Sequence, residues 1–235
     1  MLKIKNTDTY GFETAIRGMR NPMNSWEKSD SYWCGGLCED CELAPTCDIP
    51  MENAFIIGNN DLKRMKSLIK AGSDHSKFMR MINVTCDIIA PLYWWKEFDT
   101  YKVGTVRNSC STMHKIHSEE FTLDDFSHEH LINMFEEPIP YADNVTYCCN
   151  AIRTLENTID VLNGFRANYL GTKDKKYWWQ MIQLLPSSYN QRATVQLNYA
   201  VLRNMYHSRK NHKLDEWHDF CKWIKSLPYS ELITE

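Results

Sequence analysis

The chain has 235 residues and a formal net charge of −3 at pH 7. This length can bury the core of one large domain or two small ones, and the charge offers no basic surface for a polyanion, so we expect no nucleic-acid partner. No window reaches the eighteen apolar residues of a membrane span, and the N-terminus lacks the apolar core of a signal peptide. We therefore expect a cytoplasmic protein with no membrane attachment.

Cysteine spacing indicates a metal site. The chain has nine cysteines, and four lie at the spacing C-x3-C-x2-C-x5-C: Cys34, Cys38, Cys41 and Cys47. Four thiolates on a loop that contains Gly and Pro can converge on one tetrahedral ion, which favours zinc. An iron–sulfur cluster is the second interpretation, although the fourth thiol fills the position that radical enzymes leave open. Unligated, reduced thiols are the third.

The N-terminal half predicts one helix and one strand. Residues 1–30 show no clear periodicity, and their role stays open. A helix begins at Asn60, whose side chain can cap it, and ends at Gly72. Its apolar face comprises Leu62, Met65, Leu68 and Ile69. A strand follows over residues 82–90, where apolar and polar residues alternate, and Pro91 ends it.

The stretch Ala90–His114 combines several large aromatic residues with Gly104 and a Ser-Cys-Ser-Thr run. Small residues let a backbone approach a ligand closely, and aromatic side chains bury its flat faces, so one interpretation is a pocket wall. The other is a strand-to-helix junction with a buried aromatic cluster. Composition alone leaves both open.

The C-terminal half predicts four helices. The first begins at Asp143 or Asn144 and runs to about Ala167, and a shorter one ends before Pro186. The last two run over residues 191–208 and 214–225, and the second is expected to bury Leu214, Trp217, Cys221 and Ile224. With at least one strand, this pattern predicts a helix-rich α+β fold with a small, mainly antiparallel sheet. We expect a single domain over residues 1–235 with a Cys-rich insertion at about 31–50.

One face of the predicted helix over residues 191–208 carries polar side chains. Asn198 and Arg209 lie on it, with Leu202 and Met205 between them. Eleven residues of helix separate the two polar groups by roughly 16 Å, so one ligand could contact both. The alternative is a solvated arginine at a helix end, where the dipole favours a cation.

Two blocks of motifs carry a family resemblance. The C-terminal block comprises Leu185-Pro186, Asn198, Arg209, His212 and Glu216. The other comprises Asp74-His75-Ser76, Ala90-Pro91, Thr100-Tyr101-Lys102 and Asn108-Ser109-Cys110-Ser111. On these residues, over half of the chain resembles the flavin-dependent thymidylate synthases, in the branch found in some phage genomes. The Cys-rich loop lies outside the resemblance.

The resemblance implies a homotetramer that binds FAD, a dUMP-like nucleotide and methylenetetrahydrofolate. Such enzymes transfer a one-carbon unit to C5 of dUMP, with a flavin that NADPH reduces. The resemblance implies a catalytic role for Arg209 and substrate contacts from Ser109, Ser111 and Arg209. It implies cofactor contacts from His75, Tyr101, Lys102, Asn108, Asn198 and His212.

Departures from the family pattern keep other functions open. Thr100-Tyr101-Lys102 stands where the family has Arg-His-Arg, although Lys96 and Arg107 could supply charge from nearby positions. Ser109 replaces a Glu. The alternative function is a nucleotide-binding protein that kept the fold and lost the flavin chemistry. A further one makes Cys110 a nucleophile at C6 of the pyrimidine, against its interpretation as a core thiol.

Overall fold

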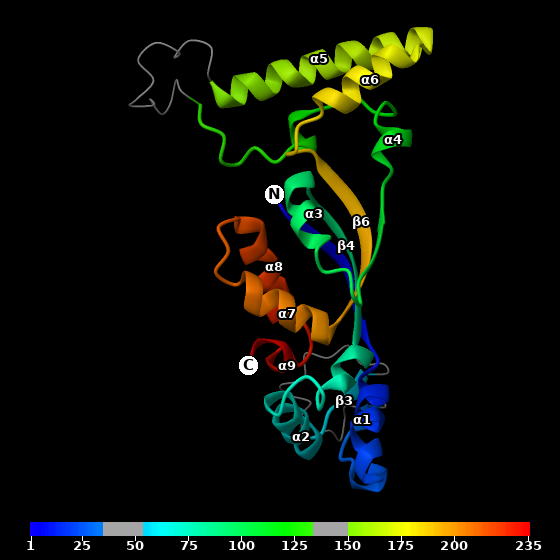
Figure 1. Cartoon of the computed structure of the whole chain (residues 1–235), viewed down its shortest axis with the longest axis vertical. Helices are drawn as coiled ribbons and strands as arrows, with labels where there is room; N and C mark the ends of the chain where they lie inside the picture. The colour runs from blue at the N-terminus through cyan, green and yellow to red at the C-terminus, as the bar shows by residue number, and fades with distance from the viewer. Residues whose placement is uncertain (35–53, 134–149) are drawn as a thin grey trace. The chain divides into compact units, whose positions relative to one another are not determined.

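The computed structural model describes residues 1–34, 54–133 and 150–235 (Figure 1). They form two compact units, each assembled from segments distant in sequence. Unit 1 comprises Met1–Lys5, Asp87–Thr100 and Arg107–Val195; unit 2 comprises Asn6–Cys86, Tyr101–Val106 and Gln196–Glu235. The single domain stays a prediction, and most of the Cys-rich insertion lies outside the described residues.

A four-stranded sheet has the strand order β1-β4-β6-β5. Its strands are β1 (Lys3–Tyr10), β4 (Asn83–Pro91), β5 (Val106–Ser109) and β6 (Asn190–Asn198). Thr194 Oγ1 donates to Asp87 Oδ1 at 2.6 Å, and Gln196 Nε2 donates to Asn83 Oδ1 at 3.4 Å. Because the partners on β4 descend as those on β6 ascend, these two strands are antiparallel. The predicted α+β class is confirmed.

Strand β4 matches its prediction closely. Val84, Cys86, Ile88 and Ala90 are buried, and the residues between them are only partly covered. This alternation is the period of two that places successive side chains on opposite faces of a sheet. One face of the strand therefore supplies the core.

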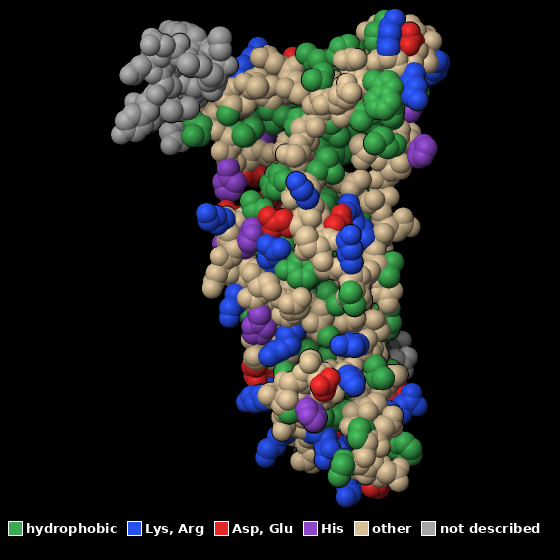
Figure 2. Space-filling view, viewed as in Figure 1, with side chains coloured by type: hydrophobic (Ala, Val, Ile, Leu, Met, Phe, Trp, Pro, Cys, Tyr) green, Lys and Arg blue, Asp and Glu red, His purple; other side chains and the backbone are tan. Residues whose placement is uncertain are grey.

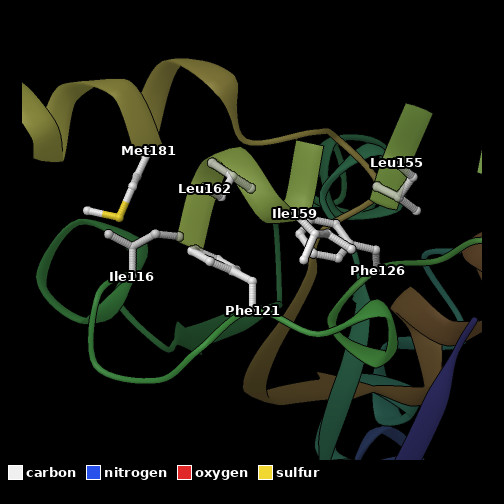
Figure 3. Packing of buried hydrophobic residues seen from close by; sticks show 7 residues of the cluster. All are labelled: Ile116, Phe121, Phe126, Leu155, Ile159, Leu162 and Met181. Atoms are coloured by element: carbon white, nitrogen blue, oxygen red, sulfur yellow. The ribbon is translucent and has the colours of Figure 1, made fainter. Parts of the chain in front are cut away.

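Unit 1 contains α3 (Leu92–Phe98), α4 (Thr112–Lys115), the 3-10 turn η6 (Leu123–Asp125), α5 (Ala151–Thr172) and α6 (Lys175–Leu184). Helices α5 and α6 pack against each other. Figure 3 shows the apolar cluster beneath them, which comprises Ile116, Phe121, Phe126, Leu155, Ile159, Leu162 and Met181. Burying one of its larger side chains stabilises the fold by about 1.5–3 kcal/mol.

Helix α3 carries the aromatic residues of the stretch Ala90–His114 into the core. Trp94, Trp95 and Phe98 are each at most 1% exposed, and their ring centroids lie 5.1 Å apart in every pair. Aromatic rings at this spacing stabilise one another beyond the burial of their area. For these three residues the buried-cluster interpretation is confirmed, and the pocket-wall interpretation is wrong.

Unit 2 contains most of the remaining helices. They are α1 (Phe12–Arg20), α2 (Asn59–Lys70), α7 (Tyr199–Arg209), α8 (Asp215–Lys225) and α9 (Glu231–Thr234), with the 3-10 turns η1 (Asn21–Met23), η2 (Trp26–Lys28) and η5 (Lys77–Met81). Strands β2 (Tyr32–Cys34) and β3 (Ala54–Ile56) form an antiparallel pair. Helix α7 packs on α8 and α9. Among the described residues, no helix has the length and apolarity that crossing a membrane requires.

A buried ion pair gives part of the N-terminal segment, of which residues 6–30 belong to unit 2, a structural role. Arg20 is 3% exposed and Asp61 is fully buried. Arg20 Nε donates to Asp61 Oδ1 at 2.7 Å, while the hydroxyls of Ser29 and Ser31 donate to Asp61 Oδ2 at 2.6 and 2.7 Å. This network joins the end of α1 and the following turn to the first turn of α2.

The predicted helix over residues 191–208 is wrong in its first half. Residues 190–198 form strand β6, and helix α7 begins only at Tyr199. Ala193, Val195 and Leu197 are buried and alternate with exposed polar residues, which is a strand pattern. Because residues after Asn198 recur at helical spacing, the alternation before Asn198 was interpreted as part of the same helix.

The predicted start of helix α2 is corrected. The helix begins at Asn59 after its N-cap Gly58, and the carboxylate of Asp30, from a distant segment, caps it by accepting from the backbone N–H groups of Asn60 and Asp61 at 2.8 and 3.0 Å. Asn60 lies inside the helix instead. Helix α5 runs from Ala151, after its N-cap Asn150, to Thr172, and its predicted start at residue 143 or 144 lies outside the described residues.

Candidate functional site

The predicted site residues fall into two groups, one in each unit. Unit 2 holds His75, Tyr101, Lys102, Asn198, Arg209 and His212, and unit 1 holds Asn108, Ser109 and Ser111.

Arg209 is the last residue of α7 and is half-buried between aromatic side chains. Its Nε donates to the Tyr101 hydroxyl at 2.9 Å. The guanidinium carbon lies 4.9 Å from the Trp217 ring centroid and 5.5 Å from that of Tyr101. A cation within about 6 Å of an aromatic ring is attracted by its quadrupole, so these contacts hold the guanidinium in place.

Trp217 connects three members of the unit 2 group, which are Arg209, Tyr101 and His212. It is fully buried in α8, and its ring lies 6.2 Å from Tyr101 and 6.3 Å from His212, both edge-on. His212 Nδ1 accepts from the backbone N–H of Leu214 at 3.2 Å, which makes Nε2 the donor of the neutral ring. Trp217 was predicted only as a core residue, and its position directly after Glu216 of the family motif is the signal that could have found it.

Asn198 has a structural role that the sequence prediction missed. It is 8% exposed and caps α7, because its Oδ1 accepts from the backbone N–H of Val201 at 3.0 Å. Its Nδ2 donates to the Gly104 carbonyl at 3.4 Å. Gly104 has φ +80°, and a Cβ there would lie 2.7 Å from Asn198 Nδ2. Asn198 therefore holds the segment that carries Tyr101 and Lys102, and this role requires a glycine.

Two predicted cofactor residues are exposed. Lys102 lies in the loop before β5, and no described residue pairs with its ammonium. His75 lies in the turn after α2, where its backbone N–H donates to the Gly72 carbonyl at 3.1 Å. Lys102 is close in sequence to Tyr101, whereas nothing in the described structure connects His75 to the aromatic group.

The unit 1 group forms an exposed turn after β5. Asn108 and Ser109 lie at the end of the strand, and Ser111 is the N-cap of α4. The Ser111 hydroxyl accepts from the backbone N–H of His114 at 3.2 Å, which leaves its proton to donate. The Cys110 thiol is exposed, so the interpretation of Cys110 as a core thiol is wrong.

Arg107 is engaged within unit 1. Its Nη1 pairs with Asp99 at 2.6 Å, its Nη2 donates to the Gln191 side chain, and its guanidinium stacks 3.9 Å from the Trp95 ring centroid. These contacts make Arg107 a structural residue of the turn. Gln191 was not singled out from the sequence, since no spacing distinguishes it.

The metal prediction lies largely outside the described residues. Cys34 ends β2, where it pairs with Ala54 of β3, and Cys38, Cys41 and Cys47 are not described. The residues that are described contain no cluster of three or more His, Cys, Asp or Glu side chains suited to a metal. Zinc at this loop stays a prediction.

Known proteins with the same fold are found by structure and not by sequence. No family model matches the chain, and no curated protein sequence matches it. The flavin-dependent thymidylate synthase of Helicobacter pylori, in complex with FAD and dUMP, superimposes with a TM-score of 0.61 at 15% identity, covering 98% of this chain and 97% of that chain.

A second type of enzyme gives the same result. The UMP/dUMP methylase PolB of Streptomyces cacaoi, bound to 5-Br dUMP, superimposes with a TM-score of 0.60 at 12% identity, covering 100% of this chain and 95% of that chain. Likeness over nearly the full length of both chains identifies a shared architecture. The chain therefore has the fold of the flavin-dependent thymidylate synthases, in agreement with the resemblance in its sequence motifs.

Proposed function

We propose that this protein transfers a one-carbon unit to C5 of a dUMP-like nucleotide, with FAD, NADPH and methylenetetrahydrofolate. The observation that supports it best is the bracing of Arg209 by Tyr101 and Trp217 in a chain with this fold. Arg209 occupies the position that the motif resemblance assigns to the catalytic arginine.

Arg209 is proposed to bind and polarise the pyrimidine. A guanidinium is planar and always protonated, so it can donate to a carbonyl oxygen of the base and stabilise negative charge that develops on the ring. Its bond to the Tyr101 hydroxyl and its packing on Trp217 restrict its motion. A preorganised cation stabilises a transition state without the cost of reorganising at the moment of reaction.

The unit 1 turn is proposed to contact the nucleotide as well. Ser111 keeps a hydroxyl proton that can donate to a phosphate or carbonyl oxygen. Ser109 is exposed beside it and offers a second hydroxyl. Because Ser109 replaces the larger Glu of the family pattern, it suits a nucleotide contact of shorter reach.

The residues present fit an anionic flavin nucleotide. Lys102 provides a cation that no described residue neutralises, and the Tyr101 and His212 rings lie beside the same buried Trp217. We assign Tyr101, Lys102, Asn108 and His212 to direct cofactor contact and keep His75 as an exposed candidate. Asn198 supports them by holding Gly104. Bound flavin would supply the hydride, and the chain's task is to orient the reactants.

Release of tritium from dUMP labelled at C5 tests the proposed function. With FAD, NADPH and methylenetetrahydrofolate, wild-type protein is expected to release the label and form dTMP or a related C5-modified nucleotide. The visible spectrum, recorded before and after denaturation, gives the bound flavin stoichiometry. Protein that binds dUMP but holds no flavin and releases no label would contradict catalysis and leave the nucleotide-binding function.

Two further assignments belong to the proposal. The C-x3-C-x2-C-x5-C spacing supports zinc, which elemental analysis of purified protein tests against iron, with Cys38→Ser and Cys41→Ser lowering the metal content. A homotetramer is expected from the resemblance. Sedimentation equilibrium gives its mass directly, and a monomer would contradict it.

A further inference from the structure

The Gln191 side chain connects three parts of unit 1. Its Nε2 donates to the Cys110 carbonyl at 2.9 Å and to Thr112 Oγ1 at 3.1 Å, and its Oε1 accepts from Arg107 Nη2. Both amide protons are therefore used on the turn that carries Ser111. The amide oxygen is used on a residue of β5.

The orientation of this amide is fixed by its partners. Arginine has only donors and a backbone carbonyl only accepts, so the oxygen must face Arg107 and the nitrogen must face Cys110. A flipped amide would place two donors together at Arg107 and two acceptors together at Cys110. The Gln191 amide thus has one stable orientation, and its hydrogen bonds hold the turn in one conformation.

Arg107 and Trp95 anchor the amide to the core. Arg107 is paired with Asp99 and stacked on Trp95, which is 1% exposed. Trp95 Nε1 also donates to the backbone carbonyl of Gln191 at 3.0 Å. A rigid core side chain therefore holds both the backbone of Gln191 and the arginine that orients its amide.

We propose that Gln191 is a positioning residue that sets nucleotide affinity by fixing the turn Ser109–Thr112. The turn is exposed, and α4 after it has only four residues. The two bonds from Gln191 Nε2 thus fix the turn on each side of Ser111 and hold its hydroxyl in one orientation. This inference rests on the proposed function, in which Ser109 and Ser111 contact the nucleotide.

The variants Gln191→Met and Gln191→Glu test this inference. Methionine keeps the length of the side chain without hydrogen bonds, and glutamate keeps an acceptor for Arg107 while losing both donors to the turn. Gln196→Ala, five residues along β6, is the matched control. The dissociation constant for dUMP is measured by calorimetry, kcat and KM by tritium release, and turn protection by amide exchange over residues 109–115.

Both Gln191 variants are expected to weaken dUMP binding about tenfold, because the turn loses the two hydrogen bonds that hold Ser111 in position. KM for the nucleotide is expected to rise by a similar factor with kcat within about twofold, and amide exchange over the turn to accelerate. Gln196→Ala is expected to leave dUMP binding, KM and amide exchange over the turn unchanged. Near-UV circular dichroism shows whether each variant is folded. If one Gln191 variant is not folded, the other is used for the test.

Two failures are distinguishable. If wild-type protein does not bind dUMP, the proposed function is wrong and this inference falls with it. If wild-type protein binds dUMP and folded Gln191→Met binds it equally well, Gln191 does not position the turn for the nucleotide and this inference alone is overturned. A lower melting temperature with unchanged KM would overturn it too, since that result marks a purely structural role.

Discussion

Arg20 and Arg209 both lie in unit 2, and both are held by specific partners, but in opposite surroundings. Arg20 is 3% exposed and meets a fully buried carboxylate and two backbone carbonyls. Arg209 is half-buried at the end of α7, beside a phenol hydroxyl and an indole face. The first arginine is enclosed by protein, and the second keeps part of its surface accessible.

Accessibility therefore separates a structural arginine from a candidate catalytic one here. A charge enclosed with its counterion destabilises the fold when the counterion is removed and cannot reach a ligand, whereas a cation held against aromatic faces is oriented and can. On the face shown in Figure 2, basic side chains are interspersed with acidic and apolar ones, so charge alone does not mark the site. Removing a partner of Arg20 should therefore lower stability, whereas removing a partner of Arg209 should lower catalytic activity.

The largest expected effect is on stability, from Asp61→Ala. This change leaves Arg20 buried without its carboxylate, which costs about 3–5 kcal/mol. Urea denaturation, followed by circular dichroism, gives the free energy of unfolding. Asp74→Ala, which removes an exposed aspartate of the same unit, is expected to change it by less than about 0.5 kcal/mol. Equal stability of the two variants would mean that the Arg20 network does not hold unit 2 together.

The second effect is on catalysis, from Arg209→Ala. Removal of a group that stabilises developing charge lowers kcat by about 10²–10³-fold, or roughly 2.7–4 kcal/mol. The melting temperature is expected to stay nearly unchanged, since Arg209 is half-buried at a helix end. Tritium release from labelled dUMP measures the loss, with Lys210→Ala, the exposed next residue, as the control. A variant with wild-type turnover would remove Arg209 from the mechanism.

A smaller effect is expected from Tyr101→Phe, which sharpens the role of the brace. The ring and its contact with Trp217 remain, while the hydrogen bond to Arg209 Nε is lost. A hydrogen bond to a charged group contributes about 1.5–3 kcal/mol, so the lower end predicts about a tenfold fall in kcat/KM. In a double-mutant cycle with Arg209→Lys, additive losses would show that Tyr101 acts independently of Arg209.

Local spacing predicted the elements whose side chains follow one clear period. Strand β4 and helix α8 were found in this way, because Val84 and Cys86 alternate at period two and Trp217, Cys221 and Ile224 recur at helical spacing. Strand β6 was missed because its alternation runs directly into helix α7 at Asn198. Two periods joined without a turn residue resemble one longer helix.

Within the candidate site, the sequence predicted residue types better than contacts. Arg209 and Tyr101 follow from the motif resemblance, and the structure places them in hydrogen-bond contact. Gln191 could not be predicted, because its partners Cys110 and Arg107 are about eighty residues away in the sequence. Long-range contacts of this kind depend on the fold, which local patterns do not contain.

The cap of α2 is a second long-range contact, and Asp30→Ala tests it with the smallest effect. Although partial burial opposes its ionisation, bonds from the backbone N–H groups of Asn60 and Asp61 hold the pKa of Asp30 below its usual value. A lowered folded-state pKa means that the stabilisation is complete above the unfolded pKa of about 3.9 and is lost as the pH falls through the folded value.

Asp30→Ala is therefore expected to lower the free energy of unfolding by about 1 kcal/mol at pH 7, with a smaller difference from wild type near pH 3. Asp30→Asn keeps an acceptor for the cap and removes the titratable group. Its free energy of unfolding at pH 7 should therefore lie between those of wild type and Asp30→Ala. Urea titrations at both pH values measure these differences. A difference between wild type and Asp30→Ala that is the same at pH 3 and pH 7 would show that the charge of Asp30 does not contribute to the cap, which would then act through packing against Gly58.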